Sequence, residues 1–442
     1  MTAQAIANST STERDARALH SSGHGVRPSE IAIGVIIGRT SEFFDFFVYA
    51  IASVLVFPPL IFPFVDRLTG TLFSFAIFAL AFVFRPVGTL IFMAIDRNYG
   101  RGTKLTIALF LLGSSTVAVA FMPGYSQIGA AAIVLLSVFR IGQGVALGGA
   151  WDGLASLLAL GVPDNKRGWY AMIPQIGAPV GLIIASGLFA FFLTNLSQAD
   201  FLDWGWRYPF FVAFALNVVA LFARLRMVVA PEYVELFTNR ELQPSPVITT
   251  VRNEGRNIVI GAFAPLASFA LFHMVTVFPL SWVYLYTQQG VARFLLIEMA
   301  GAVVGLFAIV ASGALADRFG RRTLLGCSAA AIAVFSGLAP LLLRGGEVGA
   351  AAYMVIGFIL LGISFGQSSG AVTAQFTKLS RYTGAALTSD LAWLFGAGFA
   401  PLAALALASH FGLLSAGAYL LSGAIGTLIA LGVNKELAKR VD

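Results

Sequence analysis

Long runs of apolar residues, separated by short polar or Pro/Gly-rich segments, dominate this sequence. A helix needs about 20 mostly apolar residues to cross a bilayer, and each run is at least near that length. Runs such as 105–120 and 300–314 are apolar on every side, which disfavours the alternating strands of an outer-membrane barrel. The pattern therefore predicts twelve membrane-spanning helices, at about 30–58, 70–93, 104–122, 128–160, 168–195, 207–226, 256–287, 293–315, 322–343, 349–373, 383–408 and 412–433.

Composition excludes a soluble globular domain. Of the 442 residues, 58% are hydrophobic and 11% charged, against about 25% charged residues in an ordinary soluble domain. Residues 1–29 are rich in Ser, Ala and charge and lack an apolar core, which favours a disordered cytoplasmic tail over a cleavable signal. Residues 434–442 are predicted to form a second cytoplasmic tail.

The net charge of +7 indicates topology rather than nucleic-acid binding. An even number of helices places both termini on one side. Most Lys and Arg residues fall in segments on that side, and the cationic residues on the other side are Arg67, Arg207, Arg293 and Arg344. Because cytoplasmic loops carry the excess of Lys and Arg, we expect a multi-pass protein of the bacterial inner membrane with both termini in the cytoplasm.

The chain divides into two related halves. Residues 227–255 are polar and form a predicted cytoplasmic linker between six-helix bundles at 30–226 and 256–433. A charged loop, Asp-Arg followed by Gly-Arg, recurs at 96–101 and 317–322, about half the chain apart. Two such halves are what a rocking transporter needs, with its substrate site at their interface near the bilayer midplane.

At these loops the sequence resembles the major facilitator superfamily, over about residues 42–408. The family signature G-x-x-x-D-R-x-G-R-R is matched from Gly313 to Arg322, whereas the first copy has Phe92 in place of the leading glycine and one extra residue. The resemblance implies an all-α membrane fold of twelve helices in two pseudo-symmetric six-helix bundles, acting as a monomer. It also implies that the loop charges form cytoplasmic gates, namely Asp96, Arg97, Arg101, Asp317, Arg318, Arg321 and Arg322.

Within the superfamily the sequence most resembles the metabolite:proton symporters, which include carriers of citrate, α-ketoglutarate, shikimate and proline or betaine. The likeness lies in residues 42–49, 84–88, 204–210 and 381–384, and in an R-x-x-Q-G pattern at Arg140. That branch continues with Gly-Gly-Glu, whereas here Gly149 is followed by Ala-Trp-Asp.

Ionisable residues inside a bilayer are costly, so those within the predicted helices are candidates for proton coupling. Glu42, Asp45 and Tyr49 share one helical face, which we expect to look into the cavity. By likeness to sugar porters, Asp45 is predicted to pair with Arg140 on the fourth helix. The alternative is a permanent structural ion pair. Asp152 is the other proton-coupling candidate.

Arg85 is predicted to bind a substrate carboxylate, because its planar guanidinium can hold both oxygens. A structural bond of Arg85 within the helix bundle is the alternative. Further candidates for substrate binding are Tyr49, Gln143, Gln175, His273, Tyr284, Gln367, Asp390 and Trp393. Glu298 is instead expected to form an interfacial ion pair with Arg293 near a helix end. The glycines at 142, 144, 148 and 149 predict close helix packing.

The preferred hypothesis is a secondary transporter that imports a small organic acid together with protons by alternating access. Proton-driven export of cationic, zwitterionic or amphipathic compounds is the alternative, since residues 177–181 loosely resemble an antiporter G-P-x-x-G motif. A membrane-embedded enzyme is disfavoured, because no compact set of His and Asp is visible among four histidines. No P-loop is present, and we expect no cofactor, metal or nucleic-acid partner.

Overall fold

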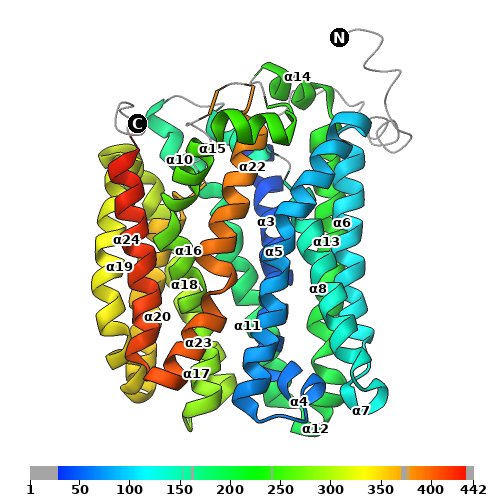
Figure 1. Cartoon of the computed structure of the whole chain (residues 1–442), viewed down its shortest axis with the longest axis vertical. Coiled ribbons are helices and arrows are strands. Elements are labelled where there is room, and N and C mark those ends of the chain that lie inside the picture. The colour runs from blue at the N-terminus through cyan, green and yellow to red at the C-terminus, as the bar shows by residue number, and fades with distance from the viewer. Residues whose placement is uncertain are drawn as a thin grey trace.

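The computed structural model describes residues 28–151, 153–160, 164–239, 242–369, 376–377 and 379–434. Across these residues the chain forms helices that run side by side along the long axis (Figure 1). Those of the first half are α3 (Pro28–Leu55), α4 (Phe57–Ile61), α5 (Arg67–Tyr99), α6 (Arg101–Phe121), α7 (Tyr125–Ile128), α8 (Ala131–Gly149), α9 (Leu154–Leu160), α10 (Arg167–Met172), α11 (Gly177–Asn195), α12 (Gln198–Asp200) and α13 (Arg207–Val229).

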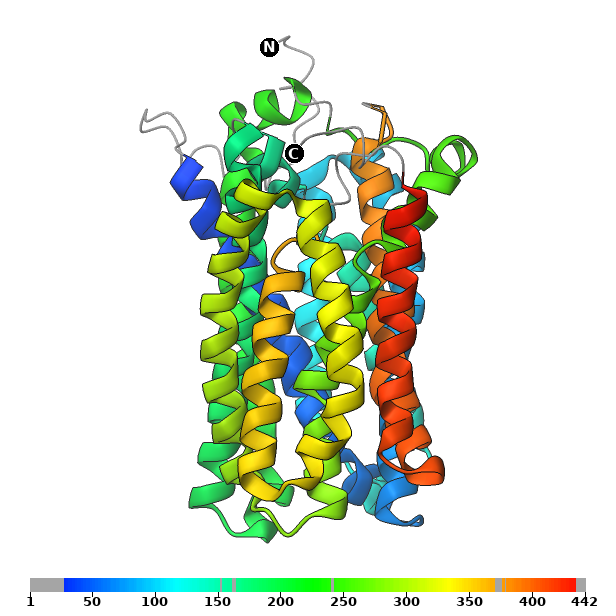
Figure 2. The ribbon, with the colours of Figure 1, turned by 90° about the vertical axis from the view of Figure 1, so that its left-hand side faces the viewer.

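The second half follows two helices of the predicted linker region. These are α14 (Pro231–Asn239) and α15 (Val247–Phe263), and α15 continues into the first predicted span of this half. The remaining helices are α16 (Leu266–Thr276), α17 (Phe278–Tyr286), α18 (Val291–Phe319), α19 (Arg321–Arg344), α20 (Gly346–Phe365), α22 (Arg381–Ala392), α23 (Ala400–Phe411) and α24 (Leu414–Val433). Figure 2 shows α18, α20, α19 and α24 side by side on one flank.

Among the described residues, eleven helical spans are long and apolar enough to cross a membrane. The one predicted span missing from these eleven is the first, which corresponds to α3. It carries Arg39, Glu42 and Asp45, so its composition alone does not identify it as a membrane span. Its residues from 41 to 55 are buried by neighbouring helices. Charges are tolerated at this depth because protein, and not lipid, surrounds them.

Several predicted spans are interrupted, among them those at 168–195, 256–287 and 383–408. A 3₁₀ turn at Ile173–Ile176 separates α10 from α11, Val277 separates α16 from α17, and a π-helical turn at Trp393–Gly398 separates α22 from α23. A proline lies in the first positions of the segment after each break or inside it, at Pro174, Pro279 and Pro401. Proline lacks the backbone N–H that a continuous helix uses, so the ladder of hydrogen bonds stops there.

Glycines allow α5 and α8 to pack backbone against backbone, as the sequence predicts. A Cβ atom on Gly144 would lie 2.4 Å from the Ala81 carbonyl oxygen, and one on Gly148 would lie 2.3 Å from the Arg85 carbonyl oxygen. Gly149 instead accommodates the ring of Phe92, the residue that replaces glycine in the first loop motif. The close packing of α5 with α8 therefore depends on glycines of α8.

The two ends of the helix bundle differ. The start of α3, the end of α24, α14 and the start of α15 lie at one end, called here the terminus face (Figures 1 and 2). The short helices α4, α7 and α12 lie at the other end, called here the far face. The two halves of the chain meet along α3, α5, α11, α16, α18 and α22, and the candidate site lies between them.

Candidate functional site

A buried cavity of about 70 Å³ lies between the two halves. A cavity needs about 10–15 Å³ of such space to hold one water, so this one has room for a few water molecules. Its wall combines charged and hydrogen-bonding groups with a patch of aromatic rings. The lining includes Arg39, Glu42, Arg85, Gln175, Arg224, Ser368 and Ser389 together with Phe269, Phe365 and Trp393.

Arg85 and Asp390 form an ion pair across the two halves at the wall of this cavity. The Arg85 Nε donates to one carboxylate oxygen of Asp390 at 2.7 Å, and the Thr89 hydroxyl donates to the other at 2.5 Å. Trp393 lies one helical turn beyond Asp390, with its ring centroid 6.0 Å from the Arg85 guanidinium carbon. Two predicted substrate-binding residues from opposite halves are thus brought together, each compensating the charge of the other.

Glu42 is held by two arginines. Its carboxylate accepts from Arg39 at 2.6 Å and from Arg224 at 2.7 Å, and Arg224 also donates to the Ala150 carbonyl. Gln175, from the 3₁₀ turn before α11, borders the same cavity, and its Oε1 has no hydrogen-bond partner within the described part of the chain. Glu42 therefore lines the cavity as predicted, but as the centre of an ion triad.

Asp45 and Arg140 do not form a direct ion pair among the described residues; a chain of hydrogen bonds connects them. The Thr116 hydroxyl donates to Asp45 at 2.5 Å, the Gln143 amide donates to Thr116 at 2.9 Å, and Arg140 donates to Gln143 at 3.0 Å. All four side chains are buried. Gln143, a predicted substrate residue, thus connects the acid to the arginine. Asp152 lies outside the described residues.

His273 is fully buried in a cage of aromatic rings that both halves build. Its ring centroid lies 5.1 Å from that of Phe46, 5.5 Å from Phe78 and 5.3 Å from Phe272. Neither ring nitrogen has a hydrogen-bond partner within the described chain. Two further buried polar atoms without a partner lie beside this cage: the Tyr49 hydroxyl, and Nη2 of Arg140, whose guanidinium carbon lies 4.0 Å from the Tyr49 ring centroid.

Two predicted substrate-binding residues, Tyr284 and Gln367, lie away from the cavity, near the ends of the bundle. Tyr284 lines a separate hollow of about 510 Å³ at the far face, beside Arg67. Gln367 is buried near the terminus face, where its amide donates to the Gly168 carbonyl at 3.0 Å. The expectation for Glu298 is wrong: Glu298 is fully buried between the halves, and Arg293 pairs with Glu347 at 2.7 Å instead.

Asp317 joins the halves at the terminus face. Its carboxylate accepts from the backbone N–H groups of Gly168 and Trp169, at 2.7 and 3.1 Å. A Cβ on Gly168 would lie 2.8 Å from that carboxylate oxygen, so only glycine permits this approach. These two amides begin α10, where free N–H groups and the helix dipole favour an anion.

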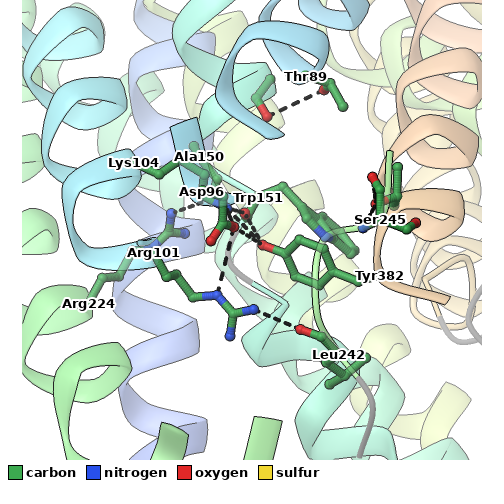
Figure 3. Close-up of polar contacts among 12 residues, drawn as sticks. Thr89, Asp96, Arg101, Lys104, Ala150, Trp151, Arg224, Leu242, Ser245 and Tyr382 are labelled. Atoms are coloured by element: carbon green, nitrogen blue, oxygen red, sulfur yellow. Dashed lines mark hydrogen bonds and ion pairs between the residues drawn. The ribbon is translucent and has the colours of Figure 1, made fainter. Parts of the chain in front are cut away.

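Tyr382 forms a second connection at this face (Figure 3). Its hydroxyl accepts from Lys104 at 2.7 Å and lies 3.3 Å from a carboxylate oxygen of Asp96, which itself pairs with Lys104 at 3.0 Å. Arg101 contacts Asp96 at 3.9 Å and donates to the Leu242 carbonyl. Lys104, on α6, is thereby tied to Tyr382, on α22, across the boundary between the halves.

The other predicted gate residues contribute less to this connection. Arg97 donates to the Ser245 carbonyl of the linker region, Arg321 lies 3.4 Å from Gln367, and Arg322 donates to the Leu431 carbonyl within its own half. Arg318 is exposed. Of the seven predicted gate residues, therefore, Asp96, Asp317 and Arg101 take part directly in contacts between the halves, since the Arg101 guanidinium carbon lies 4.9 Å from the Tyr382 ring centroid.

Sequence reasoning missed the partners of the predicted residues. In the sequence, Lys104 is one of many cations expected on the cytoplasmic side, and Tyr382 is part of the family-like segment 381–384. Arg39 and Arg224 lie 185 positions apart in the chain, and nothing in the spacing predicts that they share Glu42. The motif containing Tyr382 was the one signal that could have pointed to a gate contact.

Together, the fold and the cavity define a class: a polytopic membrane protein whose two halves close around a buried polar site. The sequence pattern of the Major Facilitator Superfamily matches residues 40–389, and the chain belongs to this family of transport proteins. It is 35% identical over 414 residues to the inner membrane metabolite transport protein YhjE of Escherichia coli K12, covering 92% of this chain and 94% of that protein.

Two further comparisons agree with this assignment. The shikimate transporter of Escherichia coli K12 is 32% identical, over 87% of this chain and 89% of that protein. Among solved structures, the proton:xylose symporter XylE bound to 6-bromo-6-deoxy-D-glucose superposes with a TM-score of 0.69 at 18% identity, covering 92% of this chain and 95% of that one. At this identity the likeness to XylE extends to the fold. The chain is therefore a multi-pass transporter and not an enzyme.

Proposed function

We propose that this protein imports a small organic acid together with protons across the bacterial inner membrane, by alternating access. The terminus face is then the cytoplasmic face. The observation that carries the proposal is the Arg85–Asp390 ion pair, which joins the two halves at the wall of the cavity. The relative named as a shikimate transporter, whose cargo is a carboxylate, supports the same class of substrate.

In this proposal the cargo carboxylate takes the place of the Asp390 carboxylate on Arg85. A guanidinium holds a carboxylate through two parallel hydrogen bonds, so a free acid can compete with a side-chain acid for the same donor. The exchange breaks a contact between the halves and replaces it with one to the cargo. Binding therefore changes the free-energy difference between the two conformations of the transporter. Such a change is required if cargo binding is to be coupled to the conformational change.

Asp45 is the proposed proton-coupling residue. Its carboxylate is buried, receives a hydrogen bond from Thr116, and is connected to Arg140 through Thr116 and Gln143. An ionised carboxylate so placed is stabilised at a distance by the arginine, and a proton removes the need for that stabilisation. Protonation of Asp45 would leave Arg140, with its unpartnered Nη2, available to cargo or to water near Tyr49 and His273.

The second candidate function is proton-coupled export of cationic or zwitterionic compounds. The observation in its favour is the lining of the cavity, where the aromatic side chains of Phe269, Phe365 and Trp393 occur together with the acid Glu42. Aromatic faces attract cations, most strongly when water is excluded. A zwitterion would bind both kinds of lining group, with its carboxylate on Arg85 and its cationic group against the aromatic rings.

The test is uptake into proteoliposomes of labelled citrate, α-ketoglutarate, shikimate, aromatic carboxylates and betaine, with and without an inward proton gradient. We expect the gradient to stimulate uptake of one carboxylate. Arg85→Ala should raise its half-saturation concentration about ten- to a hundredfold, since hydrogen bonds to charged groups contribute about 1.5–3 kcal/mol. Arg293→Ala, which removes an exposed arginine outside the cavity, is the matched control and should leave uptake unchanged.

Two variants separate the roles within the proposal. Asp45→Asn should abolish stimulation by the gradient while cargo exchange without a gradient continues. Asp390→Asn, which removes the competing charge, should keep binding through Arg85. If no acid is transported while a cation exchanges against protons, the import hypothesis is wrong and the export hypothesis replaces it.

A further inference from the structure

A second buried acid lies on the boundary between the halves, away from the cavity and from Asp45. Glu298 on α18 has no exposed surface. It faces α11 of the other half, where the Ser186 hydroxyl donates to its Oε2 at 3.2 Å. The other carboxylate oxygen, Oε1, has no partner within the described chain. At 1.5 Å per residue, Glu298 lies about 10 Å along α18 from its far-face end, at the depth of the hydrocarbon core.

No cation compensates Glu298 from the described elements that pack against α18. The facing helix α11 carries no ionisable residue. On α20, Glu347 is paired with Arg293 and the Tyr353 hydroxyl donates to the Met274 carbonyl. The remaining ionisable groups lie elsewhere: Tyr284 and Tyr286 near the far-face end of α17, the arginines of α19 in its terminal turns with Cys327 exposed, and Arg167 and Tyr170 on α10 at the terminus face.

Burial without a cation favours the neutral form of this side chain. An ionised carboxylate in a membrane interior costs several kcal/mol unless it is paired or reached by water. While α11 and α18 are in contact around Glu298, neither condition holds among the described residues. If the halves separate at the far face, water reaches the carboxylate and the cost of ionisation disappears. The contact between α11 and α18 around Glu298 is called here the seam. The number of protons bound therefore differs between the closed and the open arrangement of this seam.

We propose that Glu298 is a second proton-binding site of the carrier, which binds a proton as the α11–α18 seam closes near the far face and releases it when the seam opens. The inference rests on the proposed function only in that the two halves rock. Because the proton belongs to the closed seam, low pH favours closure and high pH favours opening. One linked proton changes the ratio of closed to open seam by up to tenfold per pH unit.

The test measures the seam directly, without cargo. Spin labels on Asn195→Cys and Leu296→Cys, exposed positions at the far-face ends of α11 and α18, report the distance across the seam in a Cys327→Ser background. In reconstituted protein we expect the short-distance population to fall as pH rises. Glu298→Gln, which has the shape of the protonated side chain, should keep the short distance at every pH.

Three further variants make the result decisive. Glu298→Met is a second neutral substitution, for use if the Gln variant does not reconstitute, and should also abolish the pH dependence. Glu298→Asp keeps a carboxyl group and should restore it. Glu347→Gln, which neutralises an exposed acid outside the cavity and away from Glu298, should retain the wild-type pH dependence. Wild-type pH dependence in both neutral variants, or a wild-type seam that does not respond to pH, would overturn the proposal. The spin-label measurement needs no cargo. The uptake test of the proposed function and this test of Glu298 can therefore fail independently of each other.

Discussion

Removal of one hydroxyl group should open the terminus face. In Tyr382→Phe, Lys104 keeps its contacts with Asp96 at 3.0 Å and with the Trp151 carbonyl at 2.6 Å, which all lie within the first half. It loses its 2.7 Å bond to the only partner it has in the second half among the described residues. The substitution therefore acts on the connection between the halves and leaves the local ion pair intact.

The magnitude follows from the charge on Lys104. A hydrogen bond to a charged group contributes about 1.5–3 kcal/mol, and a change of 1.4 kcal/mol alters an equilibrium tenfold. The population open at the terminus face should thus rise about ten- to a hundredfold. Tyr353→Phe is the matched control, because the Tyr353 hydroxyl is equally buried but donates to Met274 within the second half.

The assay is the rate at which a maleimide reaches a cysteine in the cavity. Ser389→Cys, a half-buried lining position, in a Cys327→Ser background would be labelled in inside-out vesicles. When opening and closing are fast, the labelling rate follows the open population. We expect a ten- to a hundredfold increase in Tyr382→Phe and none in Tyr353→Phe. Equal rates in the two variants would refute the reasoning that Tyr382 connects the halves.

Three other substitutions test the packing and the charges. Gly144→Ala, whose Cβ would lie 2.4 Å from the Ala81 carbonyl oxygen, should cost about 1–3 kcal/mol in a thermal unfolding assay, whereas Gly432→Ala, with open space around it, should cost nothing. Glu42→Gln removes the acid that buried Arg224 and half-buried Arg39 share, and should destabilise by about 3–5 kcal/mol by the same assay. Asp317→Ala should increase the maleimide labelling rate, and its effect should add to that of Tyr382→Phe, because the two contacts share no partner.

The sequence predicts the helices well and their partners poorly. Apolar runs and Lys/Arg placement depend on the bilayer, a uniform solvent, so local pattern is sufficient to find spans such as α5 or α18. The breaks at Val277 and Trp393 depend on how far neighbouring helices compensate a lost backbone hydrogen bond. The pattern of apolar residues along the chain contains no information about those neighbours. Contacts between halves, such as Arg85 with Asp390, join residues 305 positions apart.

Glu298 illustrates the limit most clearly. Its distance of five residues from Arg293 favoured a local ion pair, but five positions place two side chains on different faces of a helix. Arg293 faces outward and pairs with Glu347, while Glu298 faces α11. The prediction failed because it considered only the position of Glu298 along the helix. It ignored the side of the helix from which the Glu298 side chain projects.

Two helix interruptions meet the cargo cavity, one from each half. Pro174 and Gln175 of the 3₁₀ turn line it on one side, and Trp393, the first residue of the π-helical turn, lines it on the other. A regular helix transmits motion as a rod, whereas a break concentrates bending at a few residues. A molecule that does not fit this space would therefore press on the helices at two points where their hydrogen-bond ladders are interrupted. The size of the cargo would then determine how far the surrounding helices bend.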